Sequence, residues 1–154
     1  MRSLITTGVL FLGLAASAQN YHDMTEVLRS DVRTEKQAIV LSNLGLTDAQ
    51  STAFMPVYDA YTAEMKGNWD KRIALIKDYA AKYETMNDDV AASLMKQNTA
   101  LDKSALSIRE KYAKKMSKVL PATITARWMQ IETRLEKLIE LQIADEVPLM
   151  PAKK

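Results

Sequence analysis

Acidic residues in the last third of the chain have a spacing that could hold a metal ion. Glutamate recurs every four residues, which would place three carboxylates on one helix face: Glu132, Glu136 and Glu140. Helical di-iron proteins also need Glu-x-x-His pairs on facing helices, and the chain has a single histidine, His22. Arg134 and Lys137 lie between the glutamates, as in helices that carry surface ion pairs. We therefore interpret the three glutamates as a solvated ion-pair lattice and expect no metal site.

Lysines in the second half of the chain form a second candidate site. They recur over about 22 residues on the face opposite an apolar stripe, where Glu110 is the only close acid. Such a run is either an ordinary solvated helix face or a surface that attracts acidic proteins or acidic lipids. The candidate binding residues are Lys96, Lys103, Lys111, Lys114, Lys115 and Lys118.

The first 18 residues predict export. Met1-Arg2 supplies a positive start, residues 4–14 are apolar, and Ala16-Ser17-Ala18 is a small-residue cleavage site. We expect residues 1–18 to be a cleaved signal peptide and residues 19–154 to form a single helical domain in the periplasm. No later stretch is apolar for long enough to span a membrane. An uncleaved N-terminal anchor is the alternative.

Enzyme chemistry and cofactor binding find little support in the composition. Cysteine is absent, and His22 lies near the new N-terminus, outside the main predicted helices. Gly45 and Gly67, the two glycines of the mature chain, cannot build a phosphate-binding loop. Lysine and arginine nearly balance aspartate and glutamate, at 21 to 19, which does not favour nucleic acid as a partner. We expect no catalytic residue and no cofactor.

Four helices are predicted, over about 23–43, 47–86, 88–120 and 121–144, followed by an extended tail from about 145. Sparse glycine and proline and abundant Ala, Lys, Met, Leu and Glu favour long helices. Apolar residues recur at three- and four-residue spacing along the second, third and fourth helices. The second could break at Gly67-Asn68, but its stripe keeps its phase there, so we expect continuity.

The segment Leu44-Gly45-Leu46-Thr47-Asp48-Ala49-Gln50 predicts a helix end followed at once by a helix start. Gly45 suits the left-handed position after a helix. Thr47 and Gln50 have the spacing of a capping box, in which each side chain binds the other residue's backbone amide. Leu46 is expected to pack nearby on Phe54.

The helix lengths also predict a shape and an assembly. Helices of more than 30 residues would be roughly 50 Å long, which favours an elongated helical hairpin. Too few helices remain to bury every apolar stripe, so we expect a second copy to cover them in a curved antiparallel homodimer. A compact bundle with the second helix broken at Gly67 is the alternative.

Leu46-Thr47-Asp48-Ala49-Gln50, in an exported, cysteine-free, helical chain, resembles the motif of the LTxxQ superfamily of Spy/CpxP-like periplasmic proteins. The resemblance implies a curved helical dimer and an ATP-independent chaperone or a stress-signalling adaptor. Further segments are similar to a family of small secreted bacterial proteins with no established activity: Phe54–Tyr61, Val119–Pro121, Ala126–Arg127, Gln130–Glu132 and Glu146–Leu149.

Three functions remain open from the sequence. The first, which we favour, is a chaperone-like or envelope-stress adaptor protein that binds unfolded or acidic client proteins or an envelope partner. The second is a metal-sensing or metal-buffering protein; one residue's shift in cleavage would put His22 third in the chain, where Cu(II) or Ni(II) could bind. The third is a structural envelope protein with one fixed partner. The eight methionines of the mature chain suit core packing or adaptable client contact better than copper binding.

Overall fold

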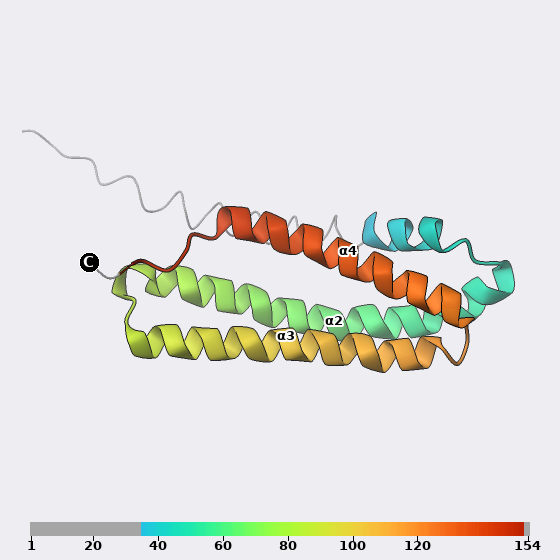
Figure 1. The fold of residues 1–154 in the computed structure, drawn as a ribbon, viewed down its shortest axis with the longest axis horizontal. Coiled ribbons are helices and arrows are strands. Elements are labelled where there is room, and N and C mark those ends of the chain that lie inside the picture. Colours follow the sequence, from blue (N-terminus) through green and yellow to red (C-terminus); the bar gives the residue numbers. More distant parts are fainter. Residues whose placement is uncertain (1–34, 153–154) are drawn as a thin grey trace, which may run out of the picture. The chain divides into compact units, whose positions relative to one another are not determined.

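The computed structural model describes residues 35–152, and this part of the chain is all-α. The expected signal peptide, His22 and the beginning of the predicted first helix lie outside the described residues. Residues 35–44 are helical and are followed by α2 (Asp48–Lys82), the short 3-10 helix η1 (Tyr83–Thr85), α3 (Asp88–Met116) and α4 (Ala122–Glu146) (Figure 1). The four helices and their order agree with the sequence prediction.

The turn between the first helix and α2 is formed as the sequence predicts. Gly45 has a φ of +63°, the left-handed conformation expected after a helix end. The Thr47 amide donates to Gln50 Oε1 at 3.0 Å, and the Gln50 amide donates to Thr47 Oγ1 at 3.3 Å. These two bonds complete the capping box and satisfy amides at the start of α2 that have no partner within the helix.

α2 and α3 form an antiparallel hairpin. α2 is continuous through Gly67, and the neighbouring Asn68 is buried, with its Nδ2 donating to the Leu101 carbonyl of α3 at 3.0 Å. At the other end of the hairpin, the Asn87 side chain accepts from the Val90 amide at 3.0 Å and caps α3. The predicted weak point at Gly67-Asn68 is therefore a place where α2 is tied to α3.

Two predicted boundaries and part of one predicted stripe are wrong. α3 ends at Met116 instead of Leu120, because residues 117–120 turn through carbonyl contacts to Ala113, Lys115 and Met116. Val119 is consequently 41% exposed, although its spacing placed it on the buried stripe. α4 continues to Glu146, slightly beyond the predicted start of the tail.

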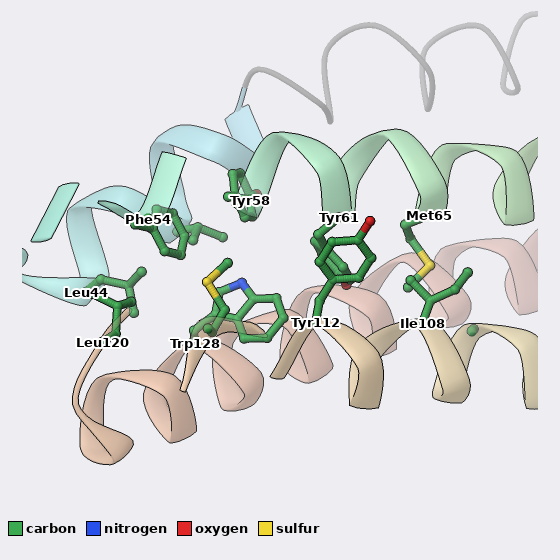
Figure 2. Packing of buried hydrophobic residues seen from close by; sticks show 12 residues of the cluster. Leu44, Phe54, Tyr58, Tyr61, Met65, Ile108, Tyr112, Leu120 and Trp128 are labelled. Carbon is green, nitrogen blue, oxygen red and sulfur yellow. The ribbon is translucent and has the colours of Figure 1, made fainter. Parts of the chain in front are cut away.

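The core lies where the first helix, α2, α3 and α4 meet (Figure 2). Tyr61 is at its centre, with ring centroids 5.1 Å from Trp128 of α4 and 5.6 Å from Tyr112 of α3, both edge-to-face. Such aromatic pairs contribute about 0.5–1.5 kcal/mol beyond the area that they bury. The remaining core residues include Val40, Leu44, Phe54, Tyr58, Met65, Ala105, Ile108, Met116 and Leu120.

The two glycines of this part of the chain predict opposite effects of alanine on stability. Gly67→Ala should stabilise the fold by about 0.5–1 kcal/mol, because Gly67 is in a helix interior and an added Cβ meets no atom within 4 Å. Gly45→Ala should destabilise it by about 1–2 kcal/mol, because the positive φ strains any residue with a Cβ. Thr47→Ala should cost about 1 kcal/mol through loss of the cap. Urea unfolding of the three variants measures these changes, and a stabilised Gly45→Ala would contradict the turn geometry.

Candidate functional site

A long groove with mainly apolar walls lies between α4 and the α2–α3 hairpin. Its volume is about 1150 Å³, and its walls come from the second half of α2, the first three quarters of α3, the part of α4 from Met129 onward and the tail after Glu146. Small-molecule pockets span about 300–1,000 Å³, so this groove is large for a compact ligand.

The first half of α4 packs more tightly against the hairpin than the second half, which lines the groove. Trp128 is fully buried and Ile131 and Leu135 are partly buried, but Leu138 is 59% exposed. The sequence stripe included Leu138 as a core position, and this prediction is wrong. Beyond Leu135, Glu136 of α4 pairs with Arg109 of the hairpin, and the groove lies between the helices from there on.

Exposed apolar side chains are concentrated in this groove. Met95 and Leu106 of α3 are 65% and 52% exposed, and Met129 of α4 is 37% exposed. Leu149 and Met150 of the tail extend the same surface and are also exposed. Water-exposed apolar groups gathered in a concave surface are typical of a binding site for another apolar group.

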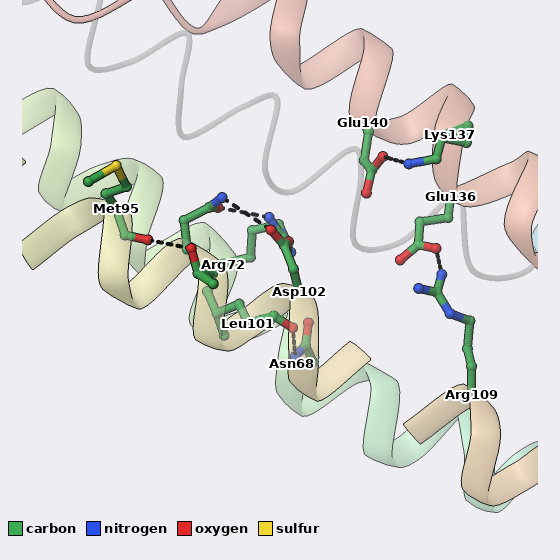
Figure 3. Close-up of polar contacts among 11 residues, drawn as sticks. Asn68, Arg72, Met95, Leu101, Asp102, Arg109, Glu136, Lys137 and Glu140 are labelled. Atoms are coloured by element: carbon green, nitrogen blue, oxygen red, sulfur yellow. Dashed lines mark hydrogen bonds and ion pairs between the residues drawn. The ribbon is translucent and has the colours of Figure 1, made fainter. Parts of the chain in front are cut away.

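Ion pairs also line the groove walls (Figure 3). Arg72 of α2 donates from Nη2 to Asp102 at 2.5 Å and from Nη1 to Asn98 at 3.1 Å, both on α3. Arg109 of α3 pairs with Glu136 of α4 and bridges the groove where the two helices begin to separate. These contacts fix the wall geometry while leaving the apolar side chains open to solvent.

The tail closes the end of the groove that lies at the C-terminal end of α2. The Tyr79 hydroxyl donates to the Pro148 carbonyl at 2.8 Å, and the Tyr83 hydroxyl donates to the Leu149 carbonyl at 3.2 Å. The two tyrosine rings also pack edge-to-face, with centroids 5.7 Å apart. The expected extended tail is therefore present in residues 147–152 and is held against the end of α2.

A buried carboxylate lies in the interior and does not line the groove. Glu132 of α4 is 2% exposed, and its Oε2 accepts from the Tyr61 hydroxyl at 2.8 Å and pairs with Lys36 Nζ at 2.6 Å. Burial, followed by the nearby Glu132 carboxylate, raises the pKa of Tyr61 far above its usual range, so Tyr61 stays a protonated donor. Burial and Glu132 raise the pKa of Tyr58 in the same way.

The solvated ion-pair lattice predicted for the three glutamates is wrong in two of its members. Glu132 is buried, and Glu136 pairs with Arg109 on another helix instead of a neighbour on its own. Glu140 behaves as predicted, since its carboxylate pairs with Lys137 at 2.7 Å. Basic residues close to Glu132 and Glu136 in the sequence could have paired with them. In the structure, both glutamates instead pair with residues of other helices.

The six candidate lysines are all exposed, five of them on α3 and Lys118 in the turn that follows it, and none of them lines the groove. One has an acidic partner that the sequence did not suggest: Lys111 Nζ lies 2.7 Å from Glu64 of α2. Hydrogen bonds from Lys111 and then from the Tyr112 hydroxyl lower the pKa of Glu64. Lys115 lies 4.5 Å from the Tyr112 ring centroid, a cation–π distance. Both interpretations of these lysines, a solvated helix face and a surface for acidic partners, stay hypotheses.

Residues 35–152 contain no group of three or more His, Cys, Asp or Glu side chains that could hold a metal ion. Among the helices in that range, none combines the length and the apolarity needed to cross a membrane.

The sequence contains only a weak indication that the groove residues form a binding surface. Met95, Leu106 and Met129 are apolar, yet they lie off the stripes that predict burial on α3 and α4. Apolar residues outside a buried stripe are the pattern that an exposed binding surface leaves. Single apolar surface residues are common, however, so the sequence alone could not gather these into one surface.

Comparisons with protein-family models, with curated proteins and with solved structures found no match to this chain. The resemblance to the LTxxQ superfamily therefore stays a prediction that rests on the quoted residues.

The Lys36–Glu132 pair predicts an asymmetric response to substitution. Lys36→Met should cost about 3–5 kcal/mol, because it leaves the buried Glu132 carboxylate without a compensating charge. Glu132→Gln should cost less, because the amide can still accept from Tyr61 and the Lys36 side chain, which is 18% exposed, can turn toward water. Lys36→Met with Glu132→Gln should then cost less than the sum of the two, a coupling that a double-mutant cycle measures. Additive costs, or a cheaper Lys36→Met, would contradict the buried pair.

Proposed function

We propose that this chain is an ATP-independent, chaperone-like or adaptor protein of the periplasm that binds apolar segments of other proteins in the groove between α3 and α4. The observation that carries the proposal is the gathering of Met95, Leu106 and Met129 as exposed side chains on the walls of one groove. We favour binding over catalysis because Glu132, the only fully buried carboxylate among residues 35–152, is not accessible to a substrate.

Methionine is suited to such a surface. Its unbranched side chain has three rotatable bonds and a polarizable sulfur, so it adapts to partners of different shape. Three methionines contribute to the groove, namely Met95, Met129 and Met150, whereas Met65 and Met116 are buried in the core. A pair of helices with an apolar furrow between them also offers the geometry in which a third, amphipathic helix can dock.

Periplasmic location is part of the proposal and rests on the charged start, the apolar run and the Ala16-Ser17-Ala18 cleavage site. We predict that protein recovered from the envelope fraction begins at Gln19, because cleavage follows Ala18. Intact mass spectrometry measures this directly. Protein in that fraction that retains Met1 would contradict export with cleavage.

The homodimer expected from the sequence also remains part of the proposal. The exposed apolar groove is a surface that a second copy could cover. Sedimentation of the purified mature chain over a range of concentrations decides between monomer and dimer.

The proposal predicts that groove residues, and not the α3 lysines, carry protection of client proteins. Met95→Gln with Leu106→Gln should shorten the lag before aggregation of an unfolded client to that of the client alone. Glutamine is a good helix former and both positions are more than half exposed, so the helix should be kept. The matched control, Lys103→Gln with Lys114→Gln on the same helix, should protect as well as wild type.

Circular dichroism of both variants checks that their helicity is retained. A lysine variant that loses protection while the groove variant keeps it would move the binding surface to the lysines, as the alternative interpretation of the sequence holds. Protection of one envelope protein and no other would favour the structural protein with a fixed partner.

A further inference from the structure

The charges on the groove walls give the chemistry of the segment that binds there. Acidic side chains outnumber basic ones in the lining, five to three: Asp88, Asp102, Glu110, Glu136 and Glu140 against Arg72, Arg109 and Lys137. Each of the three basic side chains is engaged in an ion pair with one of the acids. The lining thus has a formal charge of −2, although the chain as a whole is slightly basic.

The candidate lysines lie outside the groove lining. None of the six lines it, and Lys111 is directed to Glu64 on α2, which does not line it either. The groove therefore presents exposed apolar side chains together with an excess of carboxylates. A partner that complements both features must be apolar along one face and basic at the edges of that face.

The length of the groove gives the length of the partner. Its α4 wall runs from Met129 to Val147, which at ~1.5 Å per residue is roughly 27 Å. A helix of about 18 residues has the same length. The groove is bounded by two helices along its sides and by the tail at one end, so a third helix lying along them buries its apolar face against Met95, Leu106 and Met129.

We propose that the preferred occupant of this groove is a basic amphipathic helix of about 18 residues, from another protein, whose apolar face covers the methionines and whose lysines or arginines meet the acidic rim. This rests on the proposed function, since it specifies the class of segment that the same groove binds. It differs from the expectation of acidic partners that the α3 lysines suggest, because it concerns a different surface.

Three labelled peptides of about 18 residues test the proposal by fluorescence anisotropy with the mature chain. The first is a leucine–lysine peptide with leucines at i, i+3, i+4 and i+7. The second has glutamate in place of lysine, and the third has the composition of the first in an order that gives no apolar face. We expect the first peptide to bind about tenfold or more tightly than either of the others. Its affinity should fall as salt is raised.

Two double variants separate the apolar from the charged contribution. Met95→Gln with Leu106→Gln should weaken the first peptide about tenfold, by loss of apolar contact. Glu110→Gln with Glu140→Gln should bring the lining to neutrality and reduce the preference for the basic over the acidic peptide to about threefold or less. Lys103→Gln with Lys114→Gln is the control and should change neither value.

Several results would overturn this proposal. Equal binding of the basic and acidic amphipathic peptides would remove the charge preference. Equal binding of the first and third peptides would mean that charge alone, without an apolar face, determines binding.

Displacement of the first peptide by a fatty acid at lower concentration than by unlabelled peptide would make an acyl chain the occupant. Self-association of the free chain that Met95→Gln with Leu106→Gln abolishes would make a second copy the occupant. If no peptide binds but the chain still delays client aggregation, this inference fails and the proposed function survives; if both are absent, the proposed function fails as well.

Discussion

The buried Glu132 carboxylate is the contact on which the arrangement of the helices depends. It joins three segments that are far apart in the sequence, because it lies on α4, accepts from Tyr61 of α2 and pairs with Lys36 of the first helix. A carboxylate taken out of water costs several kcal/mol unless it is paired and hydrogen-bonded, so α4 has little freedom to slide or rotate at this point. Trp128, one turn earlier, packs edge-to-face on the same Tyr61 ring. Together they fix the first half of α4 against the hairpin.

The groove follows from the contrast between the two halves of α4. Its first half supplies Trp128, Ile131 and Leu135 to the core, and its second half is linked to the hairpin by the Glu136–Arg109 ion pair. Ion pairs hold helices at a distance set by long side chains, whereas apolar contacts draw them together. A rigid anchor at one end and a charged bridge beyond it therefore leave an open apolar furrow along the rest of the helix.

Features that depend on neighbours in the sequence could be predicted from it. The end of the first helix at Gly45, the capping box of Thr47 and Gln50, and the Asn87 cap of α3 each involve residues within one turn of each other. Features that depend on distant partners could not. Glu132 has basic residues nearby in the sequence, as a surface glutamate does, but its partners Tyr61 and Lys36 lie 71 and 96 positions away. The groove was beyond prediction for the same reason, since periodicity gives the face of a helix and not the point at which two helices separate.

The central claim is that apolar segments of other proteins bind on the walls of the groove, and methyl spectra of methionine test it most directly. Residues 19–154 contain eight methionines, which serve as probes of the groove, the core and other parts of the chain. In a titration of methyl-labelled protein with an unfolded client, the resonances of Met95, Met129 and Met150 should shift or broaden, and those of the buried Met65 and Met116 should stay in place. Client binding that leaves the three groove methyls unchanged would contradict the account.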